Sequence, residues 1–379
     1  MLVTLDRSDV TSLEQALDRL AATEGVRSAI VLLAEKGTPP ATDLDAMLSR
    51  APLPIIGGVF PAVVFDHRWS DRGAVLIGLS AELNTVLVEH LSEDEAAVRA
   101  ALADGLDPGA LRDPTTVVFA DATAEHLDGL LEGLFDRMGL LGSYLGGGAG
   151  SLSFQRRPCV FDNRGVRSDA AVVGVLDLPS CVGVAHGWQP VGAPLQITAS
   201  SGRTVHELDH APAAERYTQL VESHAVHAPD WTDFAAVAAS YPLGIVKLDE
   251  EVVVRDPIAR RGDALVCVGE IPQGAFVHLL HGDEASLLAA AAAVTDQLGG
   301  CQGGGTEVTL LLDCISRALF LGDRFVAELG TVAKGRTLAG ALTIGEVCSA
   351  GDRFLELYNK TIVLASLCSS SNDARNPLG

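Results

Sequence analysis

The sequence predicts an α/β protein of mixed α+β type, with two domains whose mixed sheets are flanked by helices. Three observations support this fold class. The 379 residues are enough for two domains of ordinary size. Hydrophobic residues make up 48% of the chain, which is enough for large cores. The order strand, helix, small-residue strand and return strand occurs three times, which predicts a fold built from repeated strand-helix-strand-strand units.

The chain begins with a helix, which the first copy of this pattern follows. Apolar residues at helical spacing predict the helix, with Thr11 or Ser12 as its N-cap: Leu13, Ala16, Leu17, Leu20 and Ala21. The first copy then has a continuous apolar strand, a short helix, a glycine-containing strand and a return strand, at residues 29–34, 42–48, 55–60 and 73–79.

The second and third copies have the same order of elements. In the second, a strand, a helix, a glycine-rich strand and a return strand are predicted at residues 116–120, 127–138, 145–150 and 170–176. In the third, the strand at 308–312 leads to one helix with an apolar stripe of Ile315, Leu319, Phe325, Val326 and Leu329. A small-residue strand at 338–346 and a return strand at 361–367 complete it.

A strand-rich stretch with turn signals lies between the second and third copies. One helix interrupts it, at residues 212–222, and the polar segment 223–230 has no periodicity. We therefore predict one domain over residues 1–222 and a second over residues 223–368. The polar residues 369–379 are predicted to form a mobile tail.

The charge and hydropathy of the chain argue against nucleic-acid and membrane partners. The formal net charge is −22, and no basic stripe of the kind that nucleic-acid binding requires is present. The N-terminus does not resemble a secretory signal, and no apolar run approaches the roughly 20 residues of a membrane span. We therefore expect a cytoplasmic protein without nucleic-acid or membrane partners.

The glycine-containing strands are the first candidate binding elements. Gly57 and Gly58 lie in the first copy, and Gly147 and Gly148 lie in the second. The second run follows a helix and precedes none, unlike a dinucleotide-binding loop, and the chain has no P-loop sequence. Glycines in strands permit close packing of neighbouring strands or the approach of a ligand to the backbone. For the four glycines as a set, we predict ligand binding.

Two residues could carry metal or catalytic chemistry. His186 ends an apolar strand before Gly187 and Trp188, which suits a haem or metal ligand but also a histidine bonded to the backbone. Cys314 lies at a strand-to-helix junction, where a thiol can become a nucleophile. Because cysteine is more commonly a small buried hydrophobe, we predict no catalytic residue and no enzymatic activity.

Polar residues within the apolar C-terminal elements form a second candidate group. Arg317, Glu346 and Asn359 each stand on or beside an apolar run, where a charged group needs a partner or a ligand. Arg317 and Glu346 could pair with each other. Alternatively, with Asn359, they could hold the carboxylate and ammonium groups of a small zwitterion.

A series of short motifs resembles those of the FIST family (F-box and intracellular signal transduction), with its N-terminal and C-terminal domains in order. The motifs cover residues 29–367 and include Pro54-Ile-Ile-Gly-Gly58, Leu145-Gly-Gly-Gly-Ala-Gly150, Val184-Ala-His-Gly-Trp-Gln-Pro190, Cys314-Ile-Ser-Arg317, Ala339-Gly-Ala-Leu-Thr-Ile-Gly-Glu346 and Tyr358-Asn-Lys-Thr361. Ser151 and Gln189 depart from residues common in the family, an aspartate and an arginine.

The resemblance implies a non-catalytic sensor of a small, amino acid-like ligand that relays its state to a separate signalling protein. The alternative is a haem-based nitric-oxide sensor similar to the NosP subgroup, with haem as cofactor and His186 as its ligand. Such members control a histidine kinase or a cyclic-di-GMP enzyme, either a diguanylate cyclase or a phosphodiesterase. Whether the chain is a homodimer is left open.

Overall fold

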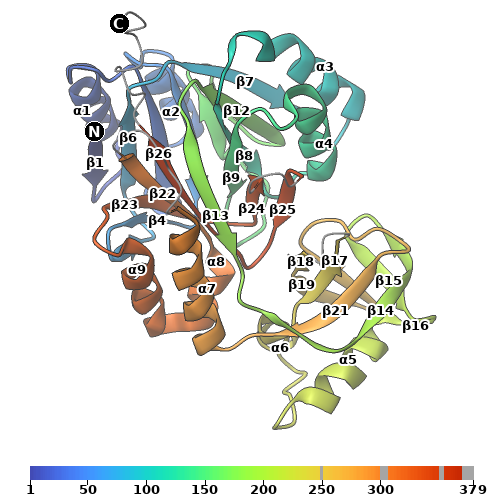
Figure 1. Cartoon of the computed structure of the whole chain (residues 1–379). Helices are drawn as coiled ribbons and strands as arrows, with labels where there is room; N and C mark the ends of the chain where they lie inside the picture. The colour runs from blue at the N-terminus through green and yellow to red at the C-terminus, as the bar shows by residue number, and fades with distance from the viewer. Residues whose placement is uncertain (248–250, 299–305, 350–353, 369–379) are drawn as a thin grey trace, which may run out of the picture.

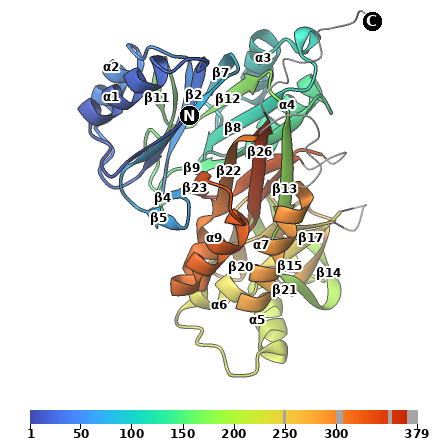
Figure 2. The same ribbon diagram turned by 60° about the vertical axis from the view of Figure 1, so that its left-hand side comes forward.

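The computed structural model describes residues 1–247, 251–298, 306–349 and 354–368. The predicted mobile tail at 369–379 lies outside these residues. These residues form a mixed α/β arrangement with four sheets, which confirms the predicted class. Figures 1 and 2 show a larger part, the core, and a smaller part to which it is joined by two connections.

The three copies of the predicted pattern form three units with one topology. In each unit the first two strands are parallel and joined by helix, and the return strand pairs antiparallel with the first. Unit 1 comprises β2 (Ser28–Ala34), α2 (Ala41–Leu48), β3 (Ile55–Phe60) and β6 (Ala74–Leu79). Unit 2 comprises β8 (Thr115–Asp121), α4 (Leu127–Met138), β9 (Ser143–Ala149) and β12 (Ala170–Leu176). Unit 3 comprises β22 (Thr306–Cys314), α8 (Ile315–Leu321), the 3-10 turn Gly322–Arg324, α9 (Phe325–Ala333), β23 (Leu338–Thr343) and β26 (Ile362–Cys368).

The units exchange hairpins in a closed cycle. After its second parallel strand, each unit sends a hairpin to the second parallel strand of another unit. Unit 1 gives β4 (Ala62–Phe65) and β5 (Arg68–Ser70) to β23, unit 3 gives β24 (Glu346–Ser349) and β25 (Glu356–Tyr358) to β9, and unit 2 gives β10 (Val160–Asp162) and β11 (Gly165–Arg167) to β3. Every unit is therefore both donor and acceptor, and the core has pseudo-threefold organisation.

One further strand completes each six-stranded sheet, and a helix follows that strand in the chain. The strands β1 (Leu2–Leu5), β7 (Leu83–Glu89) and β13 (Ser180–Ala185) pair with the return strands β6, β12 and β26. A helix follows each of these strands in the chain: α1 (Val10–Ala21), α3 (Glu95–Gly105, with the 3-10 turn Pro108–Ala110 after it) and α7 (Glu284–Gln297). Between β13 and α7, however, the chain first leaves the core.

Residues 189–281 form the smaller part, which we call the inserted domain. Its strands form one sheet in the order β18-β17-β21-β14-β15-β20-β19, with β16 paired to β15. The elements are β14 (Gln189–Ser201), β15 (Thr204–Leu208), β16 (Ala211–Pro212), α5 (Ala213–His224), α6 (Phe234–Ser240), β17 (Leu243–Val246), β18 (Val252–Arg255), β19 (Pro257–Arg261), β20 (Ala264–Cys267) and β21 (Phe276–His281). The division of the chain at residue 222 stays a prediction, while in space the inserted domain includes residues on both sides of it.

Two local predictions need correction. The first helix is capped by Asp9, whose side chain accepts from the Ser12 backbone N–H at 3.0 Å, rather than by Thr11 or Ser12. The single helix expected after β22 is divided into α8 and α9, because Gly322 adopts a left-handed φ of +53°. Of the predicted apolar stripe, Leu319 in α8 and Val326 in α9 are exposed.

One glycine occupies the same place in each unit. Gly57, Gly146 and Gly340 lie directly opposite Val31, Val118 and Leu311 in the parallel pairs. A Cβ atom at any of these glycines would collide with the backbone carbonyl oxygen of its partner. Glycine is therefore needed for the close approach of the two parallel strands.

We predict that Gly146→Ala lowers the free energy of unfolding by about 3 kcal/mol, because β8 and β9 must separate to accept the methyl group. Chemical denaturation measures this change. Gly330→Ala is the matched control: it lies on the exposed side of α9 with nothing near its added Cβ, and should be neutral or stabilising by up to about 1 kcal/mol. Equal effects at the two positions would contradict the packing argument.

Candidate functional site

The candidate site is a cleft between the core and the inserted domain. Its main cavity has a volume of about 500 Å³. From the inserted domain it is lined by Asp233, Ala235, Ala236, Ala239, Asp256, Pro257, Ile258 and Val268. From the core it is lined by Leu152, Phe154, Cys314, Ile315, Ser316, Leu319, Phe320, Ile344, Gly345, Asn359 and Lys360. A second cavity of about 320 Å³ shares Phe154, Ile258, Val268 and Ile344 with it, so the two make one interdomain cleft.

The floor of the cleft is the turn between β25 and β26. The buried Lys360 there has a φ of +54°, and its Nζ lies 3.1 Å from Asp256 Oδ2 of the inserted domain. Beside it, Asn359 Oδ1 accepts from the Asp256 backbone N–H at 3.2 Å. Arg255 Nη1 donates to the Leu357 carbonyl at 2.7 Å. This turn is therefore a direct attachment point of the inserted domain.

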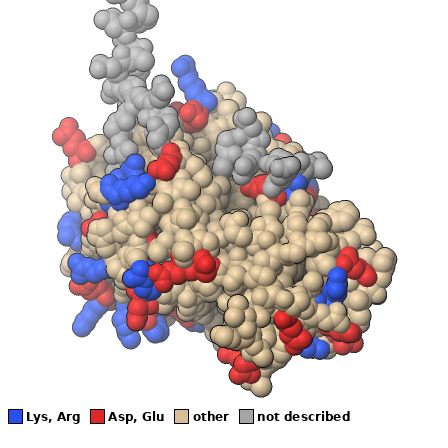
Figure 3. All heavy atoms as spheres, turned by 60° about the horizontal axis from the view of Figure 1, so that its bottom comes forward, with Lys and Arg blue, Asp and Glu red and all other residues tan. Residues whose placement is uncertain are grey.

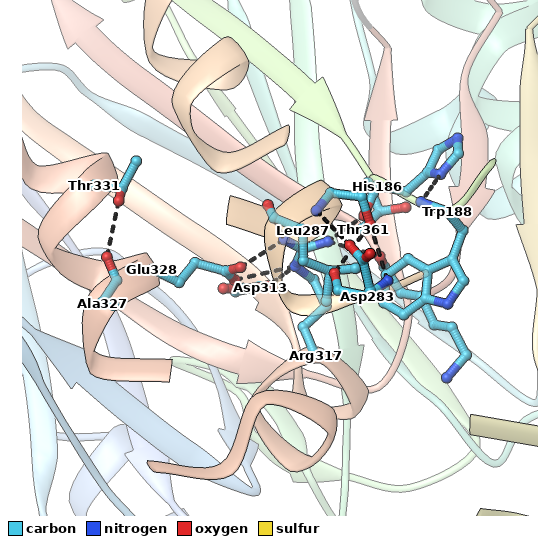
Figure 4. A network of polar contacts seen from close by, with 12 residues as sticks. His186, Trp188, Asp283, Leu287, Asp313, Arg317, Ala327, Glu328, Thr331 and Thr361 are labelled. Atoms are coloured by element: carbon cyan, nitrogen blue, oxygen red, sulfur yellow. Dashed lines mark hydrogen bonds and ion pairs between the residues drawn. The ribbon is translucent and has the colours of Figure 1, made fainter. Parts of the chain in front are cut away.

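A buried guanidinium group holds the turn from the core side. Arg317 is fully buried, and it donates to Glu328 through Nε at 3.1 Å and Nη2 at 2.7 Å (Figure 4). The same side chain donates to three backbone carbonyls, those of His186, Leu287 and Lys360. His186 and Leu287 flank the two connections to the inserted domain. Arg317 thus joins both connections to the floor of the cleft.

The indole of Trp188 lies where the two connections meet. Both Arg317 and Lys360 have their charged ends over its ring, at 5.7 and 5.3 Å from the centroid. Gly187 precedes it with a φ of +90°, and a Cβ there would lie 2.8 Å from the Ser286 carbonyl. On the other connection, a Cβ at Gly282 would lie 2.9 Å from the indole. Both connections therefore pass close to one buried aromatic ring.

The carboxyl groups around Arg317 are strongly perturbed by burial. The pKa of Asp313 is raised well above its ordinary value, first by desolvation and then by the negative charge of Glu328. Arg317 Nε lies 3.3 Å from Asp313 Oδ1 and opposes that shift. One cation therefore serves two buried carboxyl groups, and the environment favours the protonated form of Asp313.

Glu346 belongs to a neighbouring buried group rather than to the Arg317 ion pair. It accepts from Thr343 Oγ1 at 2.7 Å and from the Thr361 backbone N–H at 3.2 Å. Burial raises the pKa of its carboxyl group well above the ordinary range. The sequence analysis left open whether Arg317 pairs with Glu346. In the structure Arg317 pairs with Glu328 instead.

The thiol of Cys314 lines the cleft but is not activated. Burial raises its pKa to about 12, with the charge of Glu346 as the next cause, and Ser316 Oγ donates to the sulfur at 3.0 Å. A nucleophilic cysteine needs a lowered thiol pKa. This environment favours the thiol form at neutral pH and gives no support to a Cys314 nucleophile.

The four predicted glycines lie outside the cleft lining. A Cβ at Gly57 or Gly58 would meet the rings of Phe161 or Phe60. At Gly147 the Cβ would lie 2.6 Å from Thr343 Cγ2, and the backbone N–H of Gly148 donates to the Gly345 carbonyl at 2.8 Å. Gly147 and Gly148 thus support the segment 343–345, part of which lines the cleft. A direct ligand-binding role for these glycines stays a prediction.

Of the predicted site residues, Asn359 lines the cleft, while Arg317 and Glu346 lie buried behind it. Sequence reasoning missed Lys360 and Asp256. Lys360 is one of only four lysines in the chain and stands directly before an apolar strand. A lysine at such a position could have indicated a buried cation with an acidic partner, since lysine is almost never fully buried without a partner.

His186 is held against the first connection to the inserted domain. Its Nδ1 accepts from the Trp188 backbone N–H at 3.1 Å, and the ring also hydrogen-bonds to the Val252 backbone. Burial, with Arg317 nearby, lowers its pKa to about 4, so the imidazole is neutral at physiological pH. The residue lines a separate cavity of about 620 Å³ that also includes Val252 of the inserted domain, and haem ligation by His186 stays a prediction. Within the described residues, no group of three or more His, Cys, Asp or Glu could hold a metal ion.

The geometry is that of a core and an inserted domain, joined by two connections, with a cleft between them. Residues 28–211 match the FIST N domain, and residues 213–349 match the FIST C domain. The chain belongs to the FIST family, and FIST domains are associated with small-ligand sensing in signal transduction. No curated protein matches the chain significantly. The junction of the two matches falls inside the inserted domain, so each family domain contributes to the cleft.

Two further observations bear on partners. On the face shown in Figure 3, Lys and Arg side chains are interspersed with Asp and Glu and form no continuous basic stripe. Among the helices that the structure describes, none is both long and apolar enough to cross a membrane.

We predict that Asp313→Asn removes a pH-dependent loss of stability. A carboxyl group whose folded-state pKa is raised stabilises the fold fully below its unfolded pKa, near 4, and this contribution is lost as the pH rises through the raised value. Asparagine resembles the neutral acid and cannot ionise. The melting temperature of the variant, relative to the native protein, should therefore increase between pH 5 and pH 9. The exposed Asp136→Asn is the control, and a parallel response of the two variants would contradict the prediction.

We predict that Arg317→Met lowers the free energy of unfolding by about 3–5 kcal/mol, because it leaves the buried Glu328 without its cation. Arg99→Met, which removes an exposed arginine that pairs with Glu132 and Asp136, should cost under about 1 kcal/mol. Urea denaturation of both variants measures the difference. An Arg317 variant as stable as the Arg99 variant would refute the role assigned to this buried ion pair.

Proposed function

We propose that the protein is a non-catalytic sensor whose small ligand binds in the interdomain cleft, and that it relays its ligand state to a separate signalling partner. The observation that carries this proposal is the position of the cleft. Its floor contains an ion pair, Lys360 with Asp256, whose two members come from the core and from the inserted domain. A ligand that contacts both members acts on the attachment of one part to the other.

The attachment of the inserted domain supports a change of its position on binding. Two connections join it to the core, and both pass Trp188 with glycines at the closest approaches. A ligand shifts an equilibrium between two arrangements only if it binds one of them better. Contacts on both walls of the cleft provide that difference, because they form fully in only one arrangement of the walls.

The ligand proposed from the sequence is amino acid-like, and the structure suggests which groups would hold it. Arg317 and Glu346 are already satisfied by protein partners. In the main cavity, the opposite charges of Lys360 and Asp256 can instead receive the carboxylate and ammonium groups of a zwitterion. A histidine kinase or a cyclic-di-GMP enzyme as the signalling partner rests on the family resemblance alone.

The test is a thermal-shift screen against amino acids and related metabolites, followed by a distance measurement. Spin labels are attached to cysteines introduced at Val226 in the inserted domain and at Glu132 in the core, since both positions are exposed. The distance between the two labels reports movement of the inserted domain relative to the core. We expect at least one compound to raise the melting temperature and to narrow the label-to-label distance distribution. If no compound of any class raises the melting temperature, the proposed function fails.

The same protein sample tests the haem alternative. After reconstitution with haem, a Soret band that is lost in His186→Ala would support that alternative. Because His186 Nδ1 already accepts from the Trp188 backbone N–H and the imidazole is buried, we expect no such band. A His186-dependent band would show that His186 binds the haem iron.

A further inference from the structure

The interdomain cleft combines an apolar mouth with an ionic floor. Leu152, Phe154 and Leu319 stand at its entrance with exposed fractions of 42%, 44% and 63%. Such exposed large hydrophobic residues in one cleft favour burial of an apolar ligand surface. Phe320 and Ile258 continue this apolar lining inward.

The ammonium group at the floor has unused hydrogen-bonding capacity. Lys360 Nζ is buried, and the one polar partner of this atom among the described residues is Asp256 Oδ2 at 3.1 Å, which occupies at most one of its N–H donors. Lys360 Nζ also lies 5.3 Å from the centroid of the Trp188 ring. A lysine ammonium group has three N–H donors, and burying them unbonded is unfavourable. An acceptor supplied by a ligand would remove that cost.

The charge of the main cavity limits the kind of acceptor. Among its lining residues, Lys360 is the only cationic side chain, and Asp233 and Asp256 are acidic. A phosphate group, with up to two negative charges, would meet one lysine beside these carboxylates. A carboxylate carries one charge and needs only one ammonium partner. The cavity therefore matches a carboxylate better than a phosphate.

We propose that the ligand is a small carboxylate with an apolar body, whose carboxylate is bound by Lys360 and whose apolar part lies against Leu319, Phe320 and Phe154. This inference rests on the proposed function, because it assigns the ligand class of the same cleft. The apolar carboxylate can be a simple organic acid or the carboxylate of an amino acid with an apolar side chain. In the second case, Asp256 is placed to accept from the ammonium group of the ligand.

A matched series of compounds tests the two parts of the ligand separately. L-Phenylalanine and 3-phenylpropanoate present the carboxylate with and without the ammonium group. L-Phenylalanine methyl ester and 3-phenylpropanol have the ring but no carboxylate. Glycine and acetate have the carboxylate but no apolar body. Calorimetric titration of the full chain should detect binding of L-phenylalanine or 3-phenylpropanoate. The matching compound without a carboxylate, and the one without a ring, should each bind at least ~10-fold more weakly.

Variants then assign the binding to named residues. Lys360→Met should weaken binding of the carboxylate by ~10-fold or more, while Lys360→Arg retains the charge and part of the affinity. Lys334→Met is the matched control, since this exposed lysine also has a left-handed backbone, with a φ of +38°. If Lys360→Met does not fold, Leu319→Glu provides the second measurement: a charge at the mouth should weaken the apolar carboxylates and leave the melting temperature within a few degrees of the native value.

The outcomes separate the inference from the proposed function. Loss of affinity in the Lys360 or Leu319 variants but not in Lys334→Met supports the inference. If ester and alcohol bind as tightly as the acids, or if the Lys360 and Leu319 variants bind unchanged, the inference is wrong but the sensor proposal stands. If the matched series fails while other metabolites raise the melting temperature, the ligand class alone is overturned. If nothing binds in the wider screen, both fail.

Discussion

The ion pair of Arg317 with Glu328 is the interaction on which the rest of the structure depends. A buried guanidinium group loses its hydration, so it is tolerated only where carboxylates and carbonyls replace water. Here those acceptors come from α9, from both connections to the inserted domain and from the turn at Lys360. One side chain therefore fixes the relative positions of four segments that are far apart in the sequence.

The insertion into unit 3 explains where the cleft lies on the pseudo-threefold core. All three units have an edge strand followed by a helix, but in unit 3 the chain inserts residues 189–281 between β13 and α7. Only the corresponding turn of unit 3, between β25 and β26, consequently faces a second domain. Glu346 illustrates the divergence, because the equivalent pairing positions in the other donated hairpins are the apolar Val63 and Val160.

Local patterns in the sequence predicted the repeated units, since apolar periodicity reflects burial within each element. They did not reveal the exchange of hairpins, because the pairing of Val64 with Gly340 joins residues that are far apart in the sequence. The apolar surroundings of Arg317 correctly indicated a buried charge, yet its partner is on the next helix, beyond the break at Gly322. Lys360 was missed because lysine is usually exposed, and nothing local shows that Trp188 and Asp256 enclose it.

The closed exchange of hairpins has a consequence for the evolution and engineering of this family. If the chain were cut between its two family domains, the first half would retain β4 without β23, and β9 without β24. Each fragment would expose open strand edges, which are templates for aggregation. The two halves are thus obligate complements, and a gene encoding either one alone would not specify a self-sufficient domain. A circular permutant, in which the native termini are joined and new termini are placed in a loop, would by contrast retain every strand pair.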